Sequence, residues 1–301
     1  MRRAGAIAAA VLALAAAPGA SGAVPVAGPS VVDDSGSTVR LAQAARRIVS
    51  LSPGITELLF AIGAGAQVVG VSAYSDFPAQ ARGLPQVSRA EGIDLERIAA
   101  LAPDLIVAWG SGYSPALLDA LRRLQVPVYV LEPRSLASIA ETVERLGLLA
   151  GAPAAPDVAA AFRARLAALR HDHADRRPLV PVFYQVWSNP IMTLSGGHIA
   201  SEVMRTCGAR NVFEDLAPLV ATVDVEAVIA ARPQILLTAE SAGIDRGALD
   251  GWKRYPQLPA VAAGRLVTLD ADQLDRGSTR VLDATAQLCA IVEAVRTAAP
   301  R

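Results

Sequence analysis

The sequence is short of aromatic residues, cysteines, histidines and lysines, and these shortages narrow the classes of protein that fit it. Among 301 residues there are 3 Trp, 5 Tyr, 5 Phe, 2 Cys and 3 His, and Lys253 is the only lysine. Three histidines disfavour a histidine-rich protein for zinc or manganese. Basic and acidic residues number 28 each, and no basic stripe is present, which argues against a nucleic-acid partner.

Common catalytic motifs are also missing. The chain contains no GxSxG, HExxH, CxxC or GxxxxGK[ST] segment, so we expect no enzyme, no resident cofactor and no metal centre. A hydrolase using Ser195 and His198 is a remote alternative, because residues on one turn rarely reach each other as a catalytic pair. His171 and His173 fit a solvated helix end better than a surface metal site.

The N-terminus has the pattern of a secretory signal. Arg2 and Arg3 precede an apolar run over residues 4–17, and the small residues at 21–23 offer a cleavage site. The run is short for a bilayer span, and no cysteine follows it to carry a lipid. We therefore expect residues 1–23 to be removed and the mature protein to be exported and soluble.

One segment occurs twice. Residues 94–109 read DLERIAALAPDLIVAW and residues 224–239 read DVEAVIAARPQILLTA. Each begins with a helix-capping Asp, has Glu in the first helical turn, and continues past a proline into an apolar strand. Upstream of each copy, Thr56-Glu57 and Ser201-Glu202 begin another helix. The repetition predicts two similarly built α/β lobes.

Strands and helices alternate along the rest of the chain, which predicts an α/β fold with mainly parallel sheets. A polar lead-in covers residues 24–45. We expect an N-terminal lobe over residues 46–152, a connector helix over 153–177 and a C-terminal lobe over 178–301, with the two halves packed independently. The connector pattern at 156–175 is proline-free after its start and amphipathic, so it can act as one stiff strut.

Cys207 and Cys289 are the only cysteines. In an exported protein two cysteines usually pair, which would tie the last helix to the C-terminal lobe. Two buried free thiols are the alternative.

Loops beyond the carboxyl ends of the strands are expected to line a cleft between the lobes. They carry Tyr74, Asp76, Trp109, Tyr113, Trp187, Asn189, Asp272 and Arg276. In so aromatic-poor a chain, Tyr74, Trp109 and Trp187 beyond strand ends favour flat walls for a bulky ligand over rings that plug a sheet edge. Asp272 and Arg276 are either polar anchors for ligand amides or a surface ion pair.

These segments carry a family resemblance. The runs RRIVSLSPGITELLFAIGAGAQVVGVSAYSDFP and DLERIAALAPDLIVAW, with the cysteines in TCGARNVF and AQLCAIV, resemble periplasmic solute-binding proteins of the cobalamin and ferric-siderophore class. Within that class the chain is most similar to the cobalamin-binding components of ABC importers. The resemblance covers residues 46–295.

The resemblance implies a class III binding-protein fold, with two Rossmann-like lobes joined by one long helix, and a Cys207–Cys289 disulfide. It implies a periplasmic protein, monomeric when free, that holds cobalamin or a related corrinoid between its lobes as transported cargo and not as a cofactor. The family's ligand contacts fall on Tyr74, Trp109, Asp272 and Arg276.

The resemblance also implies a membrane partner, an ABC permease dimer with its ATPase subunits. The family's docking glutamates fall on Glu96 and Glu226, the pair that the internal repeat also selects. Taken alone, each is a common solvated carboxylate in a first helical turn.

Two positions depart from the family pattern. Close members carry a tryptophan in the loops that here read 88–90 and 218–220, where this chain has Ala90 and Val220. Trp187 is a candidate replacement for one of them. A different corrinoid such as cobinamide, haem, or a ferric siderophore therefore stays open as the ligand.

Overall fold

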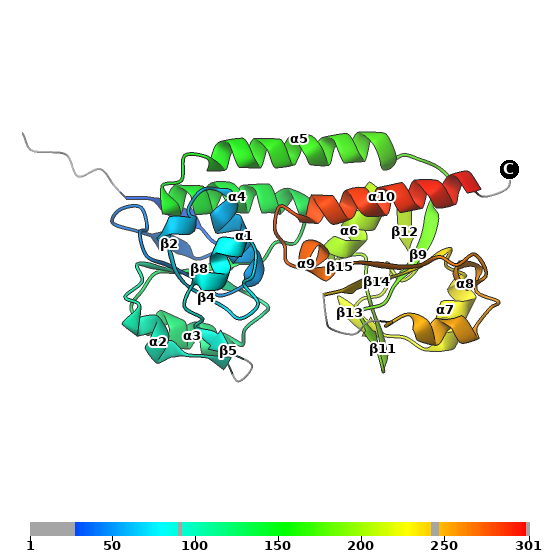
Figure 1. Ribbon diagram of the computed structural model, residues 1–301, viewed down its shortest axis with the longest axis horizontal. Helices are drawn as coiled ribbons and strands as arrows, with labels where there is room; N and C mark the ends of the chain where they lie inside the picture. Colours follow the sequence, from blue (N-terminus) through cyan, green and yellow to red (C-terminus); the bar gives the residue numbers. More distant parts are fainter. Residues whose placement is uncertain (1–27, 90–91, 242–246, 299–301) are drawn as a thin grey trace, which may run out of the picture.

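Two α/β lobes lie side by side beneath a layer of long helices (Figure 1). This computed structural model describes residues 28–89, 92–241 and 247–298, so the predicted signal at 1–23 lies outside the described residues. The predicted fold class, parallel sheets flanked by helices in two lobes with a long connecting helix, is confirmed.

The N-terminal lobe is built on a parallel sheet with strand order β4-β3-β7-β8. Strands β3, β7 and β8 are almost fully buried, as expected for a sheet with helices on both faces. Its elements in chain order are β3 (Ile48–Ser50), α1 (Pro53–Ala61), β4 (Val68–Val71), α2 (Leu95–Ala100), β7 (Leu105–Trp109), α3 (Pro115–Arg122), β8 (Val128–Leu131) and α4 (Leu136–Ala150).

The C-terminal lobe repeats this plan with strand order β12-β9-β14-β15. Numbered along the chain, both sheets have the order second, first, third, fourth, so the internal repeat seen in the sequence extends to topology. Its elements are β9 (Val180–Tyr184), α6 (Ile199–Thr206), β12 (Ala209–Asn211), α7 (Val225–Ala231), β14 (Ile235–Glu240), α8 (Pro259–Ala262), β15 (Leu266–Asp270), α9 (Ala271–Leu274) and α10 (Val281–Ala298).

The two copies of the repeated segment begin in the same way. The Asp94 carboxylate accepts a hydrogen bond from the Arg97 N–H at 2.8 Å, and the Asp224 carboxylate accepts one from the Ala227 N–H at 2.7 Å. Each Asp thus satisfies a backbone donor that the first turn of its helix leaves free. The predicted capping role of both residues is confirmed.

A layer of three helices joins the lobes. Helix α5 (Ala155–His173) runs alongside α4 and α10, which lie nearly end to end beneath it (Figure 1). Buried apolar residues from the N-terminal sheet, α5 and α10 form one cluster, whose members include Ile48, Phe162 and Leu288. Separate clusters lie on the outer side of each sheet. The expectation of independently packed halves is therefore wrong, because the inner faces share one core.

Small antiparallel sheets lie outside the two main ones. Strands β1 (Ser30–Val32) and β2 (Thr38–Arg40) pair near the N-terminus, and β5 (Ser88–Arg89) pairs with β6 (Gly92–Ile93). A third sheet joins β10 (Trp187–Ser188), β11 (Ile191–Leu194) and β13 (Val220–Thr222).

Residues 187–197 have the sequence pattern of a loop, and that interpretation is wrong for residues 187–188 and 191–194, which form β10 and β11. Thr193 and Leu194 are buried, and the strand that contains them pairs with β13, nearly thirty residues further along the chain. Local pattern alone does not reveal such a distant partner.

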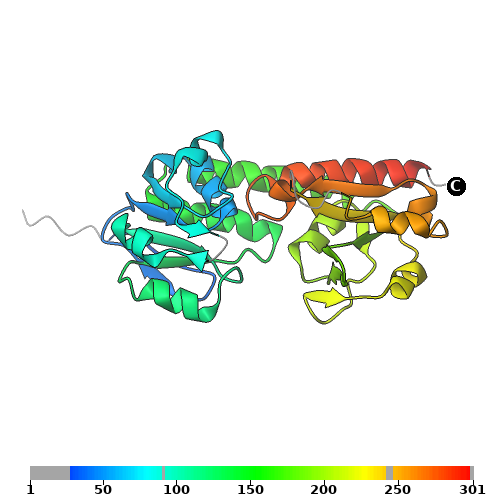
Figure 2. The same ribbon diagram turned by 60° about the horizontal axis from the view of Figure 1, so that its bottom comes forward.

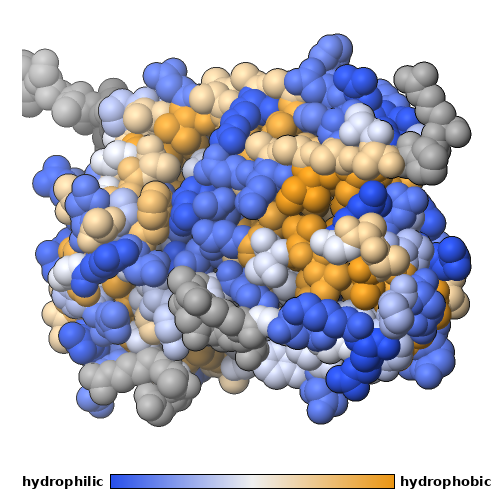
Figure 3. Space-filling model, turned by 45° about the vertical axis from the view of Figure 1, so that its right-hand side comes forward, coloured by the Kyte–Doolittle hydropathy of each residue, from blue (hydrophilic) through white to orange (hydrophobic). Residues whose placement is uncertain are grey.

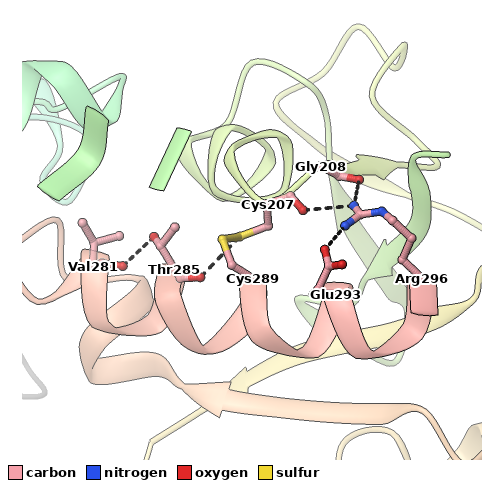
Figure 4. Close-up of a disulfide and its surroundings, with 7 residues drawn as sticks. All are labelled: Cys207, Gly208, Val281, Thr285, Cys289, Glu293 and Arg296. Carbon is pink, nitrogen blue, oxygen red and sulfur yellow. Dashed lines mark hydrogen bonds and ion pairs between the residues drawn. A yellow bond between two sulfur atoms is a disulfide. The ribbon is translucent and has the colours of Figure 1, made fainter. Parts of the chain in front are cut away.

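A disulfide between Cys207 and Cys289 ties α10 to the end of α6 (Figure 4). Their Cα atoms are 4.5 Å apart, and both residues are buried. About two turns further along α10, the Arg296 guanidinium donates a hydrogen bond to the Gly208 carbonyl at 3.0 Å. It also forms an ion pair with Glu293 on the same helix. The predicted disulfide is confirmed, and an arginine fixes the same helix pair.

None of the helices in the described part of the chain is both long and apolar enough to cross a lipid bilayer.

Candidate functional site

Two of the predicted aromatic residues follow strand ends of the N-terminal sheet. Trp109 is the last residue of β7, and 42% of its surface is exposed. A Cβ atom on Gly112 would lie 2.5 Å from the Trp109 ring, so the loop after β7 packs closely on the indole only because residue 112 is glycine. Tyr74, in the loop after β4, is 73% exposed and has a φ of 63°. Both rings are largely free to contact a ligand.

The third ring lies on the C-terminal lobe. Trp187 begins β10 and is 53% exposed, while its indole N–H donates to the Asn189 carbonyl at 3.0 Å. Leu219 and Val220 are exposed on the adjacent segment around β13. Val220 thus supplies apolar surface at one of the two positions where the family resemblance predicts a tryptophan, whereas Ala90 lies outside the described residues.

The three exposed rings do not stack on one another. Among the described residues the aromatic pairs are Phe183 with Phe213 and Trp252, and Trp252 with Tyr255, all inside the C-terminal lobe. Trp252 donates its indole N–H to the Gln185 side chain at 2.7 Å and is buried. Trp252 is therefore a core residue, and Trp109 and Trp187 are the two tryptophans exposed at the surface.

Polar strand-end residues of the two lobes meet at Arg276. Its guanidinium lies 2.8 Å from the Asp76 carboxylate of the N-terminal lobe and 2.9 Å from the Asp272 carboxylate of its own lobe. The Asp272 carboxylate also accepts from the Ser241 hydroxyl at 3.0 Å. The Asp272–Arg276 ion pair considered from the sequence is therefore present, but with only 12% of the Arg276 side chain exposed it is largely buried and not a surface pair. Loops after β4 and β15 therefore come together at the junction of the lobes.

These contacts shift the pKa values of the paired groups. Partial burial raises the pKa of Asp76, but the hydrogen bond and charge of Arg276 outweigh it and lower that pKa overall. Burial lowers the pKa of Arg276, and its hydrogen bonds to Asp76 and Glu57 outweigh that effect and raise it. Both groups therefore stay ionised at neutral pH, and the junction keeps its charges.

Asp275 lies beside this network. The Tyr184 hydroxyl donates to its carboxylate at 3.4 Å. The residue keeps contact with solvent, yet neighbouring protein atoms desolvate the carboxyl group and, with the charge of Asp272, raise its pKa to about 6. Asp275 was not singled out from the sequence, where nothing separates it from other acidic residues.

The junction between the lobes contains a cavity lined by residues of both lobes. Figure 3 shows polar side chains gathered in a band near the middle of the molecule, with an apolar area beside it on the C-terminal lobe. A cavity of about 490 Å³ lies at the junction next to Glu57 and Arg280, with Phe60, Phe77 and Pro78 among its walls. None of Tyr74, Trp109 and Trp187 lines it, so this cavity does not include the three predicted rings.

Three further contacts at the junction were missed from the sequence. The carboxylate of Glu57 on α1 accepts hydrogen bonds from Arg276 and Arg280 at 3.0 Å each and from the Ser278 hydroxyl at 2.6 Å. The Glu57 side chain is 2% exposed. The repeated Thr-Glu and Ser-Glu dipeptides marked this position, but only as a helix start.

The two candidate docking residues occupy equivalent places in the repeat. Glu96 is the second residue of α2 and Glu226 the second residue of α7, and both are exposed. Figure 1 shows α2 and α7 on the lower part of their lobes, away from the α5 layer. Each lobe thus carries one of the two glutamates on a helix that lies opposite the connecting helices.

The geometry does not support a Ser195–His198 catalytic pair. His198 is the N-cap of α6, and its Nδ1 accepts a hydrogen bond from the Ala200 N–H at 3.1 Å. Burial lowers the pKa of His198, which favours the neutral ring that this contact needs. Ser195 is buried, and its carbonyl accepts from the Ser201 hydroxyl. Both residues therefore serve the start of α6.

Within residues 28–89, 92–241 and 247–298, no group of three or more His, Cys, Asp or Glu side chains is arranged to hold a metal ion. His171 and His173 lie in the last turn of α5.

The sequence matches one known protein family and is similar to several curated proteins. The family described as "Periplasmic binding protein" matches residues 48–273. The vitamin B12-binding protein of Vibrio cholerae serotype O1 is 39% identical over 246 residues, which cover 81% of this chain and 88% of that protein. The vitamin B12-binding protein of Yersinia pestis is 35% identical over 257 residues, covering 85% and 89% of the two chains.

The fold is also similar to those of binding proteins with solved structures. The periplasmic vitamin B12-binding protein BtuF of Vibrio cholerae superposes with a TM-score of 0.75 at 37% identity, covering 84% of this chain and 98% of that one. The heme-binding protein RhuT from Roseiflexus sp. RS-1, in its apo form, gives a TM-score of 0.74 at 25% identity, covering 84% and 99%.

Proposed function

Because this chain belongs to the periplasmic binding protein family, we propose that it is the solute-binding component of an ABC importer and that its cargo is cobalamin or a related corrinoid. The observation that supports this most is the 39% identity to a vitamin B12-binding protein over 88% of that protein's length. A likeness of that extent includes both lobes and the loops beyond their strands.

The exposed rings fit a flat, bulky cargo. Tyr74 and Trp109 on one lobe and Trp187 on the other leave 73%, 42% and 53% of their surface free, respectively. Rings of this kind contribute large contact areas with little loss of side-chain entropy when a planar ligand covers them. Asp272 and Arg276, which pair at 2.9 Å, would fix the ligand's amide groups by hydrogen bonds. In this proposal no bond is made or broken, and affinity comes from burial and a few polar anchors.

Delivery to a permease is the second part of the proposal. Glu96 and Glu226 are exposed, lie one on each lobe, and sit at equivalent positions of the repeat. A pair of carboxylates with this symmetry suits a two-subunit permease that offers one basic site per subunit. We place the protein in the periplasm after removal of residues 1–23, as a monomer until it docks.

Haem is the second candidate cargo. The likeness to a heme-binding protein at a TM-score of 0.74 favours it, and so does the thinner aromatic lining left by Val220. Haem and corrinoids share a broad tetrapyrrole-type ring but differ at the edge, where corrinoids carry amides and haem carries two carboxylates. Arg276, the arginine proposed as a ligand anchor, is already paired with three carboxylates, which disfavours a dianionic ligand.

The test is a titration of the purified mature protein with cyanocobalamin, haemin and a ferric siderophore, followed by calorimetry and tryptophan fluorescence. We expect saturable binding of cyanocobalamin at one molecule per chain, with quenching of the two exposed tryptophans. Saturable binding of haemin or the siderophore with no response to cyanocobalamin or cobinamide would overturn the assignment of the cargo. Mass spectrometry of ligand carried by protein from its native periplasm is the independent control.

A further inference from the structure

The two lobes touch through a buried polar cluster that neither the aromatic site nor the docking surface explains. We name Glu57, Arg276, Ser278 and Arg280 the interlobe clamp. Glu57 comes from α1 of the N-terminal lobe, and the other three come from the segment between α9 and α10 of the C-terminal lobe, more than 200 residues away in sequence. Figure 2 shows this segment reaching from the C-terminal lobe toward the N-terminal one.

Every oxygen of the Glu57 carboxylate is used in the clamp. One oxygen accepts from the guanidinium groups of Arg276 and Arg280, both at 3.0 Å, and the other accepts from the Ser278 hydroxyl at 2.6 Å. With only 2% of the side chain exposed, the carboxylate has three protein donors in place of water. A buried carboxylate with this many charged donors has one favoured position, and so have the donors.

The backbones of the two lobes also meet at the clamp. A Cβ atom on Gly54 would lie 1.7 Å from the Arg276 carbonyl oxygen, so α1 and the Arg276 segment are in direct contact. The Arg280 guanidinium stacks over the Phe77 ring of the N-terminal lobe, 4.1 Å from its centroid. Contacts of this closeness leave little freedom for one lobe to slide on the other.

The internal repeat provides a counterpart. Glu202 on α6 is the residue that corresponds to Glu57, and its carboxylate accepts from the Leu136 N–H at 2.8 Å and from Arg170 at 2.6 Å. Leu136 is the first residue of α4. Each lobe therefore sends a glutamate from its first helix to the start of the other lobe's last helix, α10 in one direction and α4 in the other.

We propose that Glu57 is a positioning residue of the ligand site: it fixes the spacing of the two lobes and the position of the Arg276 guanidinium, which is a proposed ligand anchor. Arg276 links the clamp to the proposed ligand site because it contacts Glu57, Asp76 and Asp272 at once. The effect on ligand affinity rests on the proposed function, whereas the effect on lobe spacing does not. Glu57 acts through Arg276 and does not itself contact the ligand.

The test measures lobe spacing without ligand. Spin labels are placed on two exposed positions, Arg122→Cys in the N-terminal lobe and Lys253→Cys in the C-terminal lobe. The distribution of distances between the two labels is then recorded by double electron–electron resonance spectroscopy. Cys207 and Cys289 are joined to each other and do not take the label. We compare the clamp variant Glu57→Gln with the control Glu144→Gln, which breaks an exposed pair with Arg163 away from the clamp.

Glu57→Gln is expected to broaden the distance distribution and to weaken cyanocobalamin binding by about tenfold, because only part of the population then has the binding geometry. Glu144→Gln is expected to change neither. Should Glu57→Gln not fold, Arg280→Gln gives a milder loosening, since Arg276 and Ser278 still hold Glu57.

The outcomes separate the two proposals. An unchanged distance distribution in a folded clamp variant overturns the positioning role, whatever its effect on melting temperature. A broadened distribution together with an unchanged affinity for a bound corrinoid also overturns it, because lobe spacing would then not govern the site. A broadened distribution in a protein whose wild type binds no corrinoid keeps the clamp and rejects the proposed cargo.

Discussion

Replacement of Trp109 by alanine is the most direct probe of the proposed ligand surface. A tryptophan side chain offers roughly 250 Å² of contact area, and 42% of Trp109 is free, so about 100 Å² of indole remains for a ligand to cover. At about 25 cal/mol per Å², full coverage contributes about 2.5 kcal/mol, or about seventyfold in affinity. The loss of the ring also opens the site to water, as is usual where a tryptophan anchors an interface.

We therefore expect Trp109→Ala to weaken cyanocobalamin binding between about tenfold and seventyfold in calorimetry. Trp109→Phe keeps a flat ring on Gly112 and is expected to lose less than the alanine variant. Leu148→Ala serves as the matched control, because Leu148 is 62% exposed on α4 in the helix layer and has no proposed ligand contact.

Circular dichroism and thermal melting must first establish that the variants are folded. A folded Trp109→Ala variant with wild-type affinity would refute the reasoning, since the free indole would then not face the cargo. Equal losses in Trp109→Ala and Leu148→Ala would refute it too, because the effect would not belong to the ring.

The remaining predictions concern stability and delivery. Cys207→Ala combined with Cys289→Ala opens a loop of 82 residues and is expected to lower the free energy of unfolding in urea by about 4.5 kcal/mol in the chain-entropy description, with the ligand affinity unchanged; an unchanged unfolding midpoint would contradict this. Glu96→Arg combined with Glu226→Arg is expected to leave the dissociation constant intact and to abolish uptake through the cognate permease, while Glu141→Arg on α4 leaves both intact. Normal uptake by the double variant would reject the docking role.

Much of the fold was predictable from sequence because its signals are local. Asp94 and Asp224 are residues that cap helices, and each precedes a short helical pattern, a proline and a buried strand. Such patterns act within a few residues and do not depend on the rest of the chain. The disulfide was predictable for a different reason, since two cysteines in an exported protein leave a single pairing.

The contacts between the lobes were not predictable in this way. Glu57 was visible as part of a repeated dipeptide, yet its partners lie more than 200 residues downstream, and nothing in the local pattern tells a buried carboxylate from a solvated one. Strand β11 was missed for the same reason, because β13 completes it from a distance. Arg276 was chosen by resemblance as a ligand contact, whereas its pairing with three carboxylates emerges only when both lobes are in place.

The shared interior beneath α5 has a consequence for how this chain can be divided. Apolar side chains of α4, α5 and α10 belong to one buried cluster that continues into both sheets. A fragment ending after α4 would expose to water the apolar face of α4 that α5 covers in the whole protein. A fragment beginning at β9 would likewise expose the face of α10 that α5 covers. Neither half is thus a self-contained module, and any exchange of cargo specificity between relatives must graft loops onto an intact scaffold instead of recombining whole lobes.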